Sequence, residues 1–195
     1  MRLNKNHNVV KRFASKGVFP YQFAFTLLIP LRIIFLSPKT LIKRLGLKED
    51  SVVLEIGPGP GFFSVKVART ISKGKLYLTD IQKEMLDYAK KRLLKKNISN
   101  AEFKLCDGNS LPFESDMFDI VFLVAVLGEI SNKNAYIKEI FRVLRKNGTL
   151  SISELPGDPD NMTIEEIQNL VEEFGFKPDK IYGAGRNFTV NFTKE

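Results

Sequence analysis

Short apolar runs alternate with amphipathic segments along most of the chain, and this alternation constrains the fold more than any other feature. Strand patterns occupy residues 51–56, 75–80, 101–107, 118–127 and 149–154. Helical patterns occupy residues 37–46, 62–72, 83–97, 133–148 and 163–176. Residues 179–195 are typical of a two-stranded hairpin. The order predicts an α/β fold with a doubly wound, mostly parallel, seven-stranded sheet and a C-terminal antiparallel hairpin.

Sheets of this type bind ligands at the carboxyl ends of their strands, near the switch in strand order. Chemistry is therefore expected just after residues 56, 80, 107, 127 and 154.

A glycine-rich loop follows the first predicted strand. Glycines and prolines alternate there: Gly57, Pro58, Gly59, Pro60 and Gly61. Without a Cβ, glycine lets backbone approach a ligand closely, and the following helix presents unpaired N–H groups. A dinucleotide fingerprint requires G-x-G-x-x-G, but the spacing here is G-x-G-x-G, with Phe62 at the last fingerprint position. The loop predicts a ligand-binding turn; a plain strand–helix turn is the alternative.

Two further strands end in aspartates. Asp80 can accept both hydroxyls of a ribose, or it can cap the next helix. Asp107 can accept a hydrogen bond from an exocyclic amine of adenine while the next N–H donates to a ring nitrogen. Its alternative is an Asp-Gly turn.

The segments VLEIGPGPGFFS, LYLTDIQKEML, CDGNSLPFESDMFDIVFLVAVLGEI and EIFRVLRKNGTLSISE together resemble the class I S-adenosylmethionine-dependent methyltransferases. The similarity extends over roughly residues 38–195 and is nearest to the branch of quinone and other small-molecule methyltransferases. It implies a Rossmann-like fold, S-adenosylmethionine as cofactor and transfer of its methyl group to a small-molecule or lipid-like acceptor.

The resemblance also implies roles for individual residues. Gly57, Gly59 and Gly61, with Pro58 between them, would line the methionine part of the cofactor. Glu55 would orient this loop or the cofactor's amino group.

The remaining cofactor positions follow the next strands. Asp80 would hold the ribose, with Ile81 against the adenine. Asp107 and Gly108 would read the adenine edge. Val124 and Ala125 would face the sulfonium end.

Methyl transfer from a sulfonium is an in-line displacement, and alignment can supply much of the rate. Where the acceptor must lose a proton, a base helps. Glu129 is the candidate catalytic residue and a candidate acceptor contact, with a helix-start carboxylate as its alternative. Glu154 is a further acceptor candidate. The Asn/Asp-Pro-Pro-aromatic turn of enzymes that methylate base or glutamine nitrogens is absent, because LVAVLGEI stands there.

The N-terminal segment, residues 1–48, differs from the expected methyltransferase domain, residues 49–195. It carries ten Lys and Arg and no Asp or Glu, whereas the remainder carries 20 basic and 22 acidic side chains. Its aromatic residues could shape an acceptor pocket: Phe13, Phe19, Tyr21, Phe23 and Phe25. The segment is a helical cover, an acceptor lid or a peripheral membrane contact.

Composition limits the other function classes. The near-neutral main domain makes nucleic acid an improbable partner. One cysteine and one histidine predict no metal site, and the cysteine content suits the cytoplasm. Two alternatives stay open: a nicotinamide-dependent oxidoreductase, and a non-catalytic S-adenosylmethionine-binding protein. The methyl acceptor and the oligomeric state are not predicted.

Overall fold

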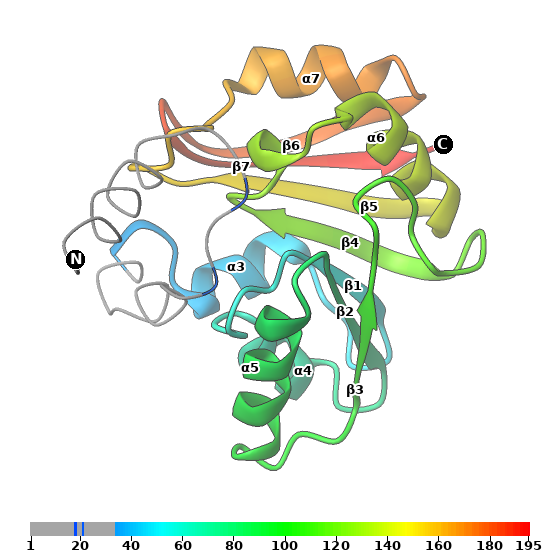
Figure 1. Ribbon diagram of the computed structural model, residues 1–195. Helices are drawn as coiled ribbons and strands as arrows, with labels where there is room; N and C mark the ends of the chain where they lie inside the picture. The colour runs from blue at the N-terminus through cyan, green and yellow to red at the C-terminus, as the bar shows by residue number, and fades with distance from the viewer. Residues whose placement is uncertain (1–17, 19–20, 22–33) are drawn as a thin grey trace, which may run out of the picture.

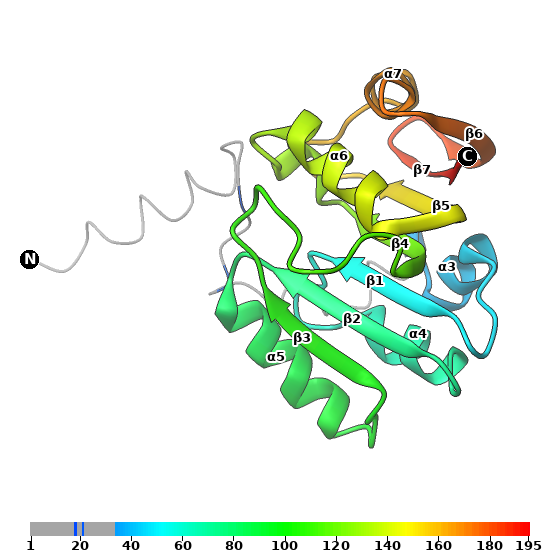
Figure 2. The same cartoon turned by 90° about the vertical axis from the view of Figure 1, so that its right-hand side faces the viewer.

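The computed structural model describes Val18, Tyr21 and residues 34–195, and these form a three-layer α/β structure (Figures 1 and 2). The central sheet has seven strands in the order β3-β2-β1-β4-β5-β7-β6. The strands are β1 (Val52–Ile56), β2 (Lys75–Asp80), β3 (Ala101–Leu105), β4 (Phe118–Val124), β5 (Leu144–Glu154), β6 (Phe176–Ala184) and β7 (Asn187–Lys194). The first five are parallel, and β7 runs antiparallel between β5 and β6. The predicted seven-stranded α/β fold and its antiparallel C-terminal hairpin are confirmed.

Helices cover both faces of the sheet because the buried strands are apolar on both sides. One core cluster includes buried residues of α3 (Pro38–Leu45), α4 (Ser64–Thr70) and α5 (Lys83–Leu94). The other includes those of α6 (Lys133–Val143) and α7 (Ile164–Glu172). Leu41 and Leu45 bury one side of α3. Ser37 caps its N-terminus, and Gly46, with a φ of 63°, caps its C-terminus after Leu45. Helix α3 thus belongs to the core of the sheet domain.

Several predicted boundaries are wrong. Strand β6 begins at Phe176, the last residue of the helix expected over residues 163–176, and β4 ends at Val124 rather than at residue 127. The largest difference concerns α6. The helix expected to reach Gly148 ends at Val143, and β5 begins at the next residue. Leu144 is fully buried and pairs with Phe118. The Lys194 ammonium donates to the carbonyl oxygens of Phe141 (2.8 Å) and Leu144 (2.6 Å). A cation from the far end of the chain therefore satisfies carbonyls at the helix C-terminus, which a local pattern does not reveal.

The predictions for the N-terminal segment fall largely outside the described residues. These include the predictions for the aromatic residues Phe13, Phe19, Phe23 and Phe25. Within the described part of the chain, no helix has the length and apolar character needed to cross a membrane.

Candidate functional site

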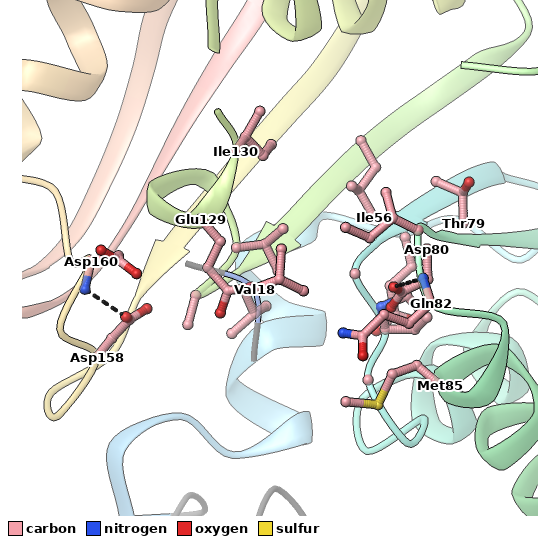
Figure 3. A pocket seen from close by; sticks show the side chains of 18 of the residues that line it. Val18, Ile56, Thr79, Asp80, Gln82, Met85, Glu129, Ile130, Asp158 and Asp160 are labelled. Carbon is pink, nitrogen blue, oxygen red and sulfur yellow. Dashed lines mark hydrogen bonds between the residues drawn. The ribbon is translucent and has the colours of Figure 1, made fainter. Parts of the chain in front are cut away.

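A cavity of about 700 Å³ opens at the carboxyl-terminal edge of the parallel strands. Its wall is formed by the ends of β1, β2 and β4 and by the loops after β3 and β5, with Val18 and Phe35 from the N-terminal region. Figure 3 shows side chains from these elements around the cavity. The volume lies within the range of small-molecule sites, and the location is the expected one for a doubly wound sheet.

The glycine loop forms one wall of the cavity. Gly57 has a φ of 64°, and its N–H donates to the carbonyl oxygen of Thr79 at 2.9 Å. A Cβ at Gly57 would lie 2.6 Å from Cγ2 of Val126, so a larger residue fits neither the backbone nor the space. Gly59 and both loop prolines also line the cavity.

Gly61 has a different environment from the other loop glycines. It is buried and is not among the described residues that line the cavity. A Cβ there would lie 3.2 Å from Cα of Ala89 and 3.2 Å from Cδ1 of Leu93. The structure therefore places Gly61 where the loop packs on α5, and its predicted cofactor contact stays a prediction.

Glu55, on β1 just before this loop, is a buried carboxyl group on the cavity wall. It is 3% exposed, and its Oε2 has no hydrogen-bond partner among the described residues. Burial raises the pKa of Glu55 to about 8. The nearby Ser64 hydroxyl has the smaller, opposite effect of lowering this pKa, although the geometry between the two groups does not meet the criteria for a hydrogen bond to Oε2. An unsatisfied buried carboxyl is costly, so this group suits a ligand that donates a hydrogen bond or carries positive charge.

Asp80 lies beside the glycine loop because β1 and β2 pair in parallel, with Ile56 opposite Thr79. It is 9% exposed, and its Oδ1 accepts a hydrogen bond from the Gln82 N–H at 2.9 Å. Burial raises the pKa of Asp80 to about 6, against the lowering effect of backbone N–H groups of Gln82 and Ile81. Gln82, rather than Asp80, is the N-cap of α5. Asp80 and the exposed Ile81 both line the cavity.

Asp107 builds the turn after β3 and lines the cavity as well. Its Oδ1 accepts hydrogen bonds from the N–H groups of Asn109 and Ser110, both at 2.8 Å. These bonds lower the pKa of the exposed Asp107 carboxyl. Gly108, which also lines the cavity, has a φ of 82°. The turn interpretation is thus observed, and it leaves the backbone of residue 108 facing the site.

The end of β4 brings Val124, Ala125 and Glu129 to the cavity wall. Ala125 takes a φ of 54°, and its N–H donates to the carbonyl oxygen of Ser153 at 2.8 Å. Glu129 ends the short 3-10 helix Leu127–Glu129. Glu129 lies on the side of the cavity away from Asp80 (Figure 3).

Two other predicted acceptor residues are not among the described residues that line the cavity. Tyr21 is half-buried. Glu154 is fully buried at the end of β5. Its Oε2 accepts a hydrogen bond from the Asn161 amide at 3.3 Å, and its Oε1 has no partner among the residues that the structure describes. Burial, followed by the charges of Asp158 and Glu129, raises the pKa of Glu154 to about 8. Their roles toward an acceptor stay predictions.

Sequence reasoning missed the acidic loop after β5. Asp158 and Asp160 line the cavity, and the Asp160 N–H donates to Oδ1 of Asp158 at 2.9 Å (Figure 3). Val126, which limits the space at Gly57, was missed too. The sequence PGDPDN directly follows a predicted strand end, and the rule that placed the other sites at strand ends could have found this loop.

The residues present fit an adenosyl-methionine group. The glycine backbone leaves room that a Cβ would fill, Glu55 offers an unsatisfied buried carboxyl to an amino group, and Asp80 stands at the adjacent strand end for a ribose. These features lie along one side of a single cavity. A zwitterionic, net positive ligand suits a wall with acidic side chains and backbone dipoles.

Comparison with known proteins gives the same assignment. The sequence pattern of a family described as "Methyltransferase domain" matches residues 47–177. The ubiquinone/menaquinone biosynthesis C-methyltransferase UbiE of Pseudomonas putida is 32% identical over 135 residues, which is 68% of this chain and 52% of that protein. Its counterpart from Neisseria meningitidis is 36% identical over 109 residues, 55% of this chain and 44% of that protein. The chain thus spans about half the length of these relatives.

A solved structure supports the fold over nearly the whole chain. The crystal structure of an S-adenosylmethionine-dependent methyltransferase from Aquifex aeolicus superimposes with a TM-score of 0.84 at 25% identity. The match covers 91% of this chain and 100% of that one. The fold of this chain is therefore shared with a solved methyltransferase structure.

Proposed function

Because this chain belongs to the methyltransferase domain family, we propose that it is an S-adenosylmethionine-dependent methyltransferase acting on a small-molecule acceptor. The observation that carries the proposal is the buried Oε2 of Glu55, which has no hydrogen-bond partner in the described part of the chain and lies on the cavity wall beside the Gly57–Gly59 backbone and Asp80. The cofactor supplies a methyl group on a sulfonium, whose leaving group needs no further activation. The chain's own task is to bind, to align the acceptor and to exclude water.

Each wall of the cavity has a part in this proposal. Glu55 accepts the amino group of the cofactor, the Gly57–Gly59 backbone lies along its methionine part, and Asp80 accepts the ribose hydroxyls. Asp107 and Gly108 border the adenine. Val124 and Ala125 lie at the start of the acceptor half, where Glu129 can orient the acceptor or take its proton.

The cofactor assignment can be tested by thermal unfolding with S-adenosylhomocysteine, with NADH as the parallel ligand. A ligand that binds only the native state, at one hundred times its dissociation constant, raises the free energy of unfolding by about 2.7 kcal/mol. For a domain of this size, we expect Tm to rise by roughly 5–10 °C. The Asp80→Asn variant should lose most of this rise, and Asp87→Asn, on the exposed side of α5, should keep it. A rise with NADH alone would favour the oxidoreductase alternative.

Turnover separates an enzyme from a binding protein. Transfer of label from methyl-labelled S-adenosylmethionine to an extract of small molecules and lipids should require Asp80 and the native chain. Binding of S-adenosylhomocysteine without any transfer would support the non-catalytic alternative.

The N-terminal segment can bring the site to a lipid surface, which would make the protein peripheral to the cytoplasmic membrane face. Its six basic residues before residue 34, interleaved with aromatic ones, support this proposal. Vesicles with anionic lipid should retain the full chain and release a chain lacking residues 1–36. Equal retention of both chains would refute the membrane contact.

A further inference from the structure

Tyr136 is a core residue of α6 whose polar end reaches the cavity. It belongs to the core cluster on the α6 side of the sheet, together with Ile137 and Ile140 of the same helix. The residue is only 2% exposed, yet it lines the cavity. Its hydroxyl lies 3.8 Å from Sγ of Cys106, which lines the cavity as well. Packing therefore fixes the aromatic ring, and the hydroxyl is the part of the side chain at the ligand site.

This hydroxyl lies at the end of the cavity assigned to the cofactor. Cys106 directly precedes Asp107, and the Cys106 N–H donates to the carbonyl oxygen of Asp80 at 3.1 Å. Burial raises the pKa of Tyr136, and the neighbouring Cys106, Asp80 and Asp107 raise it further. Helix α6 thus brings a hydroxyl close to both the strand end assigned to the ribose and the turn assigned to the adenine.

The hydroxyl is a hydrogen-bond donor without a strong acceptor. Because its pKa is raised, Tyr136 is protonated at neutral pH and its O–H can donate. Among the described residues, its one hydrogen-bond partner is the Cys106 thiol, and sulfur is a weak acceptor. Oδ1 of Asp80 and Oδ1 of Asp107 accept backbone N–H groups instead. A buried Tyr hydroxyl usually has a good partner, so this donor suits a ligand that brings an acceptor.

Adenine brings acceptors of the right kind. Its exocyclic amine donates hydrogen bonds, whereas its ring nitrogens N1, N3 and N7 accept them. A carboxylate such as Asp107 can therefore bind the amine but cannot serve a ring nitrogen, which requires a donor. The Gly108 N–H is one candidate donor, and the Tyr136 hydroxyl is a second donor at the same end of the cavity.

We propose that Tyr136 is a further cofactor-binding residue, whose hydroxyl donates a hydrogen bond to a ring nitrogen of the adenine. This inference rests on the proposed function and deepens it, because adenine recognition then involves α6 as well as the turn after β3. The ring is held by core packing before any ligand binds. The donor is therefore in position beforehand, and little conformational entropy is lost when the bond forms.

Calorimetric titration of the full chain with S-adenosylhomocysteine tests this contact through binding alone. The other probes are its 1-deaza, 3-deaza and 7-deaza analogues, in each of which a C–H replaces one ring nitrogen. The wild-type chain should bind at least one analogue about threefold or more weakly than the parent ligand. Tyr136→Phe removes only the hydroxyl and should lower the affinity for the parent ligand by about 3- to 12-fold. The same variant should discriminate less than about 1.5-fold against the analogue that lacks the contacted nitrogen, with its other ratios unchanged.

Two further variants locate the effect. Tyr88→Phe removes a hydroxyl from α5, at a residue that is 43% exposed and is not among the described residues lining the cavity. It should bind every probe as the wild-type chain does. Cys106→Ala breaks the same sulfur–hydroxyl contact as Tyr136→Phe but leaves the donor in place. It should keep the parent affinity within about twofold and should retain the discrimination between analogues.

Three results would overturn the role of Tyr136. The first is wild-type affinity for S-adenosylhomocysteine in Tyr136→Phe. The second is an equal loss of affinity for the parent ligand and all its analogues in that variant, because a merely structural hydroxyl would act on every ligand alike. The third is the same loss in Cys106→Ala as in Tyr136→Phe. A wild-type chain that does not bind S-adenosylhomocysteine at all would instead refute the proposed function, and this inference with it.

Discussion

Substitution of Gly57 by alanine should destabilise the protein in two separable ways. The φ of 64° is a left-handed conformation that costs a residue with a Cβ about 1–2 kcal/mol. The new Cβ would lie 2.6 Å from Cγ2 and 3.0 Å from Cγ1 of Val126, and overpacking of this kind costs about 1–3 kcal/mol. A more restricted unfolded chain returns about 0.4–1 kcal/mol. We expect a net loss of about 3 kcal/mol.

Three companion variants divide this cost. Gly185→Ala is the matched control, because Gly185 has a φ of 62° and a Cβ there would meet no atom of a described residue within 4 Å. It should lose only the conformational part. Val126→Ala removes the side chain that crowds the new Cβ, so it should recover stability in the Gly57→Ala background, with a favourable coupling energy of about 1–3 kcal/mol. In the Gly185→Ala background, Val126→Ala should show no such coupling energy.

Denaturant unfolding gives the free energies, and a thermal scan should show Tm about 6–12 °C lower for Gly57→Ala. Affinity for S-adenosylhomocysteine should fall in the same variant, because the loop must shift to make room. A steric clash between the new Cβ and Val126 is refuted if Gly57→Ala is no less stable than Gly185→Ala. It is also refuted if the coupling energy between Gly57→Ala and Val126→Ala is below about 0.5 kcal/mol.

Two further predictions concern a buried acid and a helix cap. The pKa of Glu154 is about 8 in the folded state, above its value of about 4.3 in an unfolded chain. Folding therefore favours the neutral acid. The resulting contribution to the free energy of unfolding is present below about pH 4.5 and is lost as pH rises to about 8. Glu154→Gln should therefore lose less stability than wild type between pH 5 and pH 8, by an amount on the order of 2 kcal/mol in denaturant unfolding; parallel pH profiles would contradict this. Thr163 and Glu166 form a capping box at the N-terminus of α7, so Thr163→Ala should cost about 1 kcal/mol, measured as a Tm lower by about 2–4 °C, with unchanged ligand affinity. A large loss of affinity in that variant would mean that α7 acts on the site.

Patterns among residues close in the sequence predicted much of the fold and the part of the cavity wall that includes Glu55, Asp80 and Asp107. Strand and helix patterns depend on neighbouring side chains, which is why the order of elements and the capping box of α7 were predictable. Residues at strand ends meet at one edge of a parallel sheet by geometry, so Glu55, Asp80 and Asp107 were correctly brought to one cavity.

Contacts between distant segments explain the differences. The end of α6 depends on Lys194, which donates to carbonyls 50 and 53 residues earlier in the chain. Gly61 packs on α5 because of the space between Ala89 and Leu93, although its spacing alone groups it with the other loop glycines. No local pattern contains this information.

The sequence by itself determined the class of fold and the place of the glycine loop, because these follow from periodicity, turn chemistry and strand ends. It gave the candidate cofactor only through the resemblance to S-adenosylmethionine-dependent methyltransferases. Only the tertiary structure decided which acidic side chains lie together on the cavity wall. Glu129 and the loop with Asp158 and Asp160 come from different strand ends and meet because β4 and β5 are paired. The full burial of Glu154, and with it the raised pKa, also exists only once the sheet is covered.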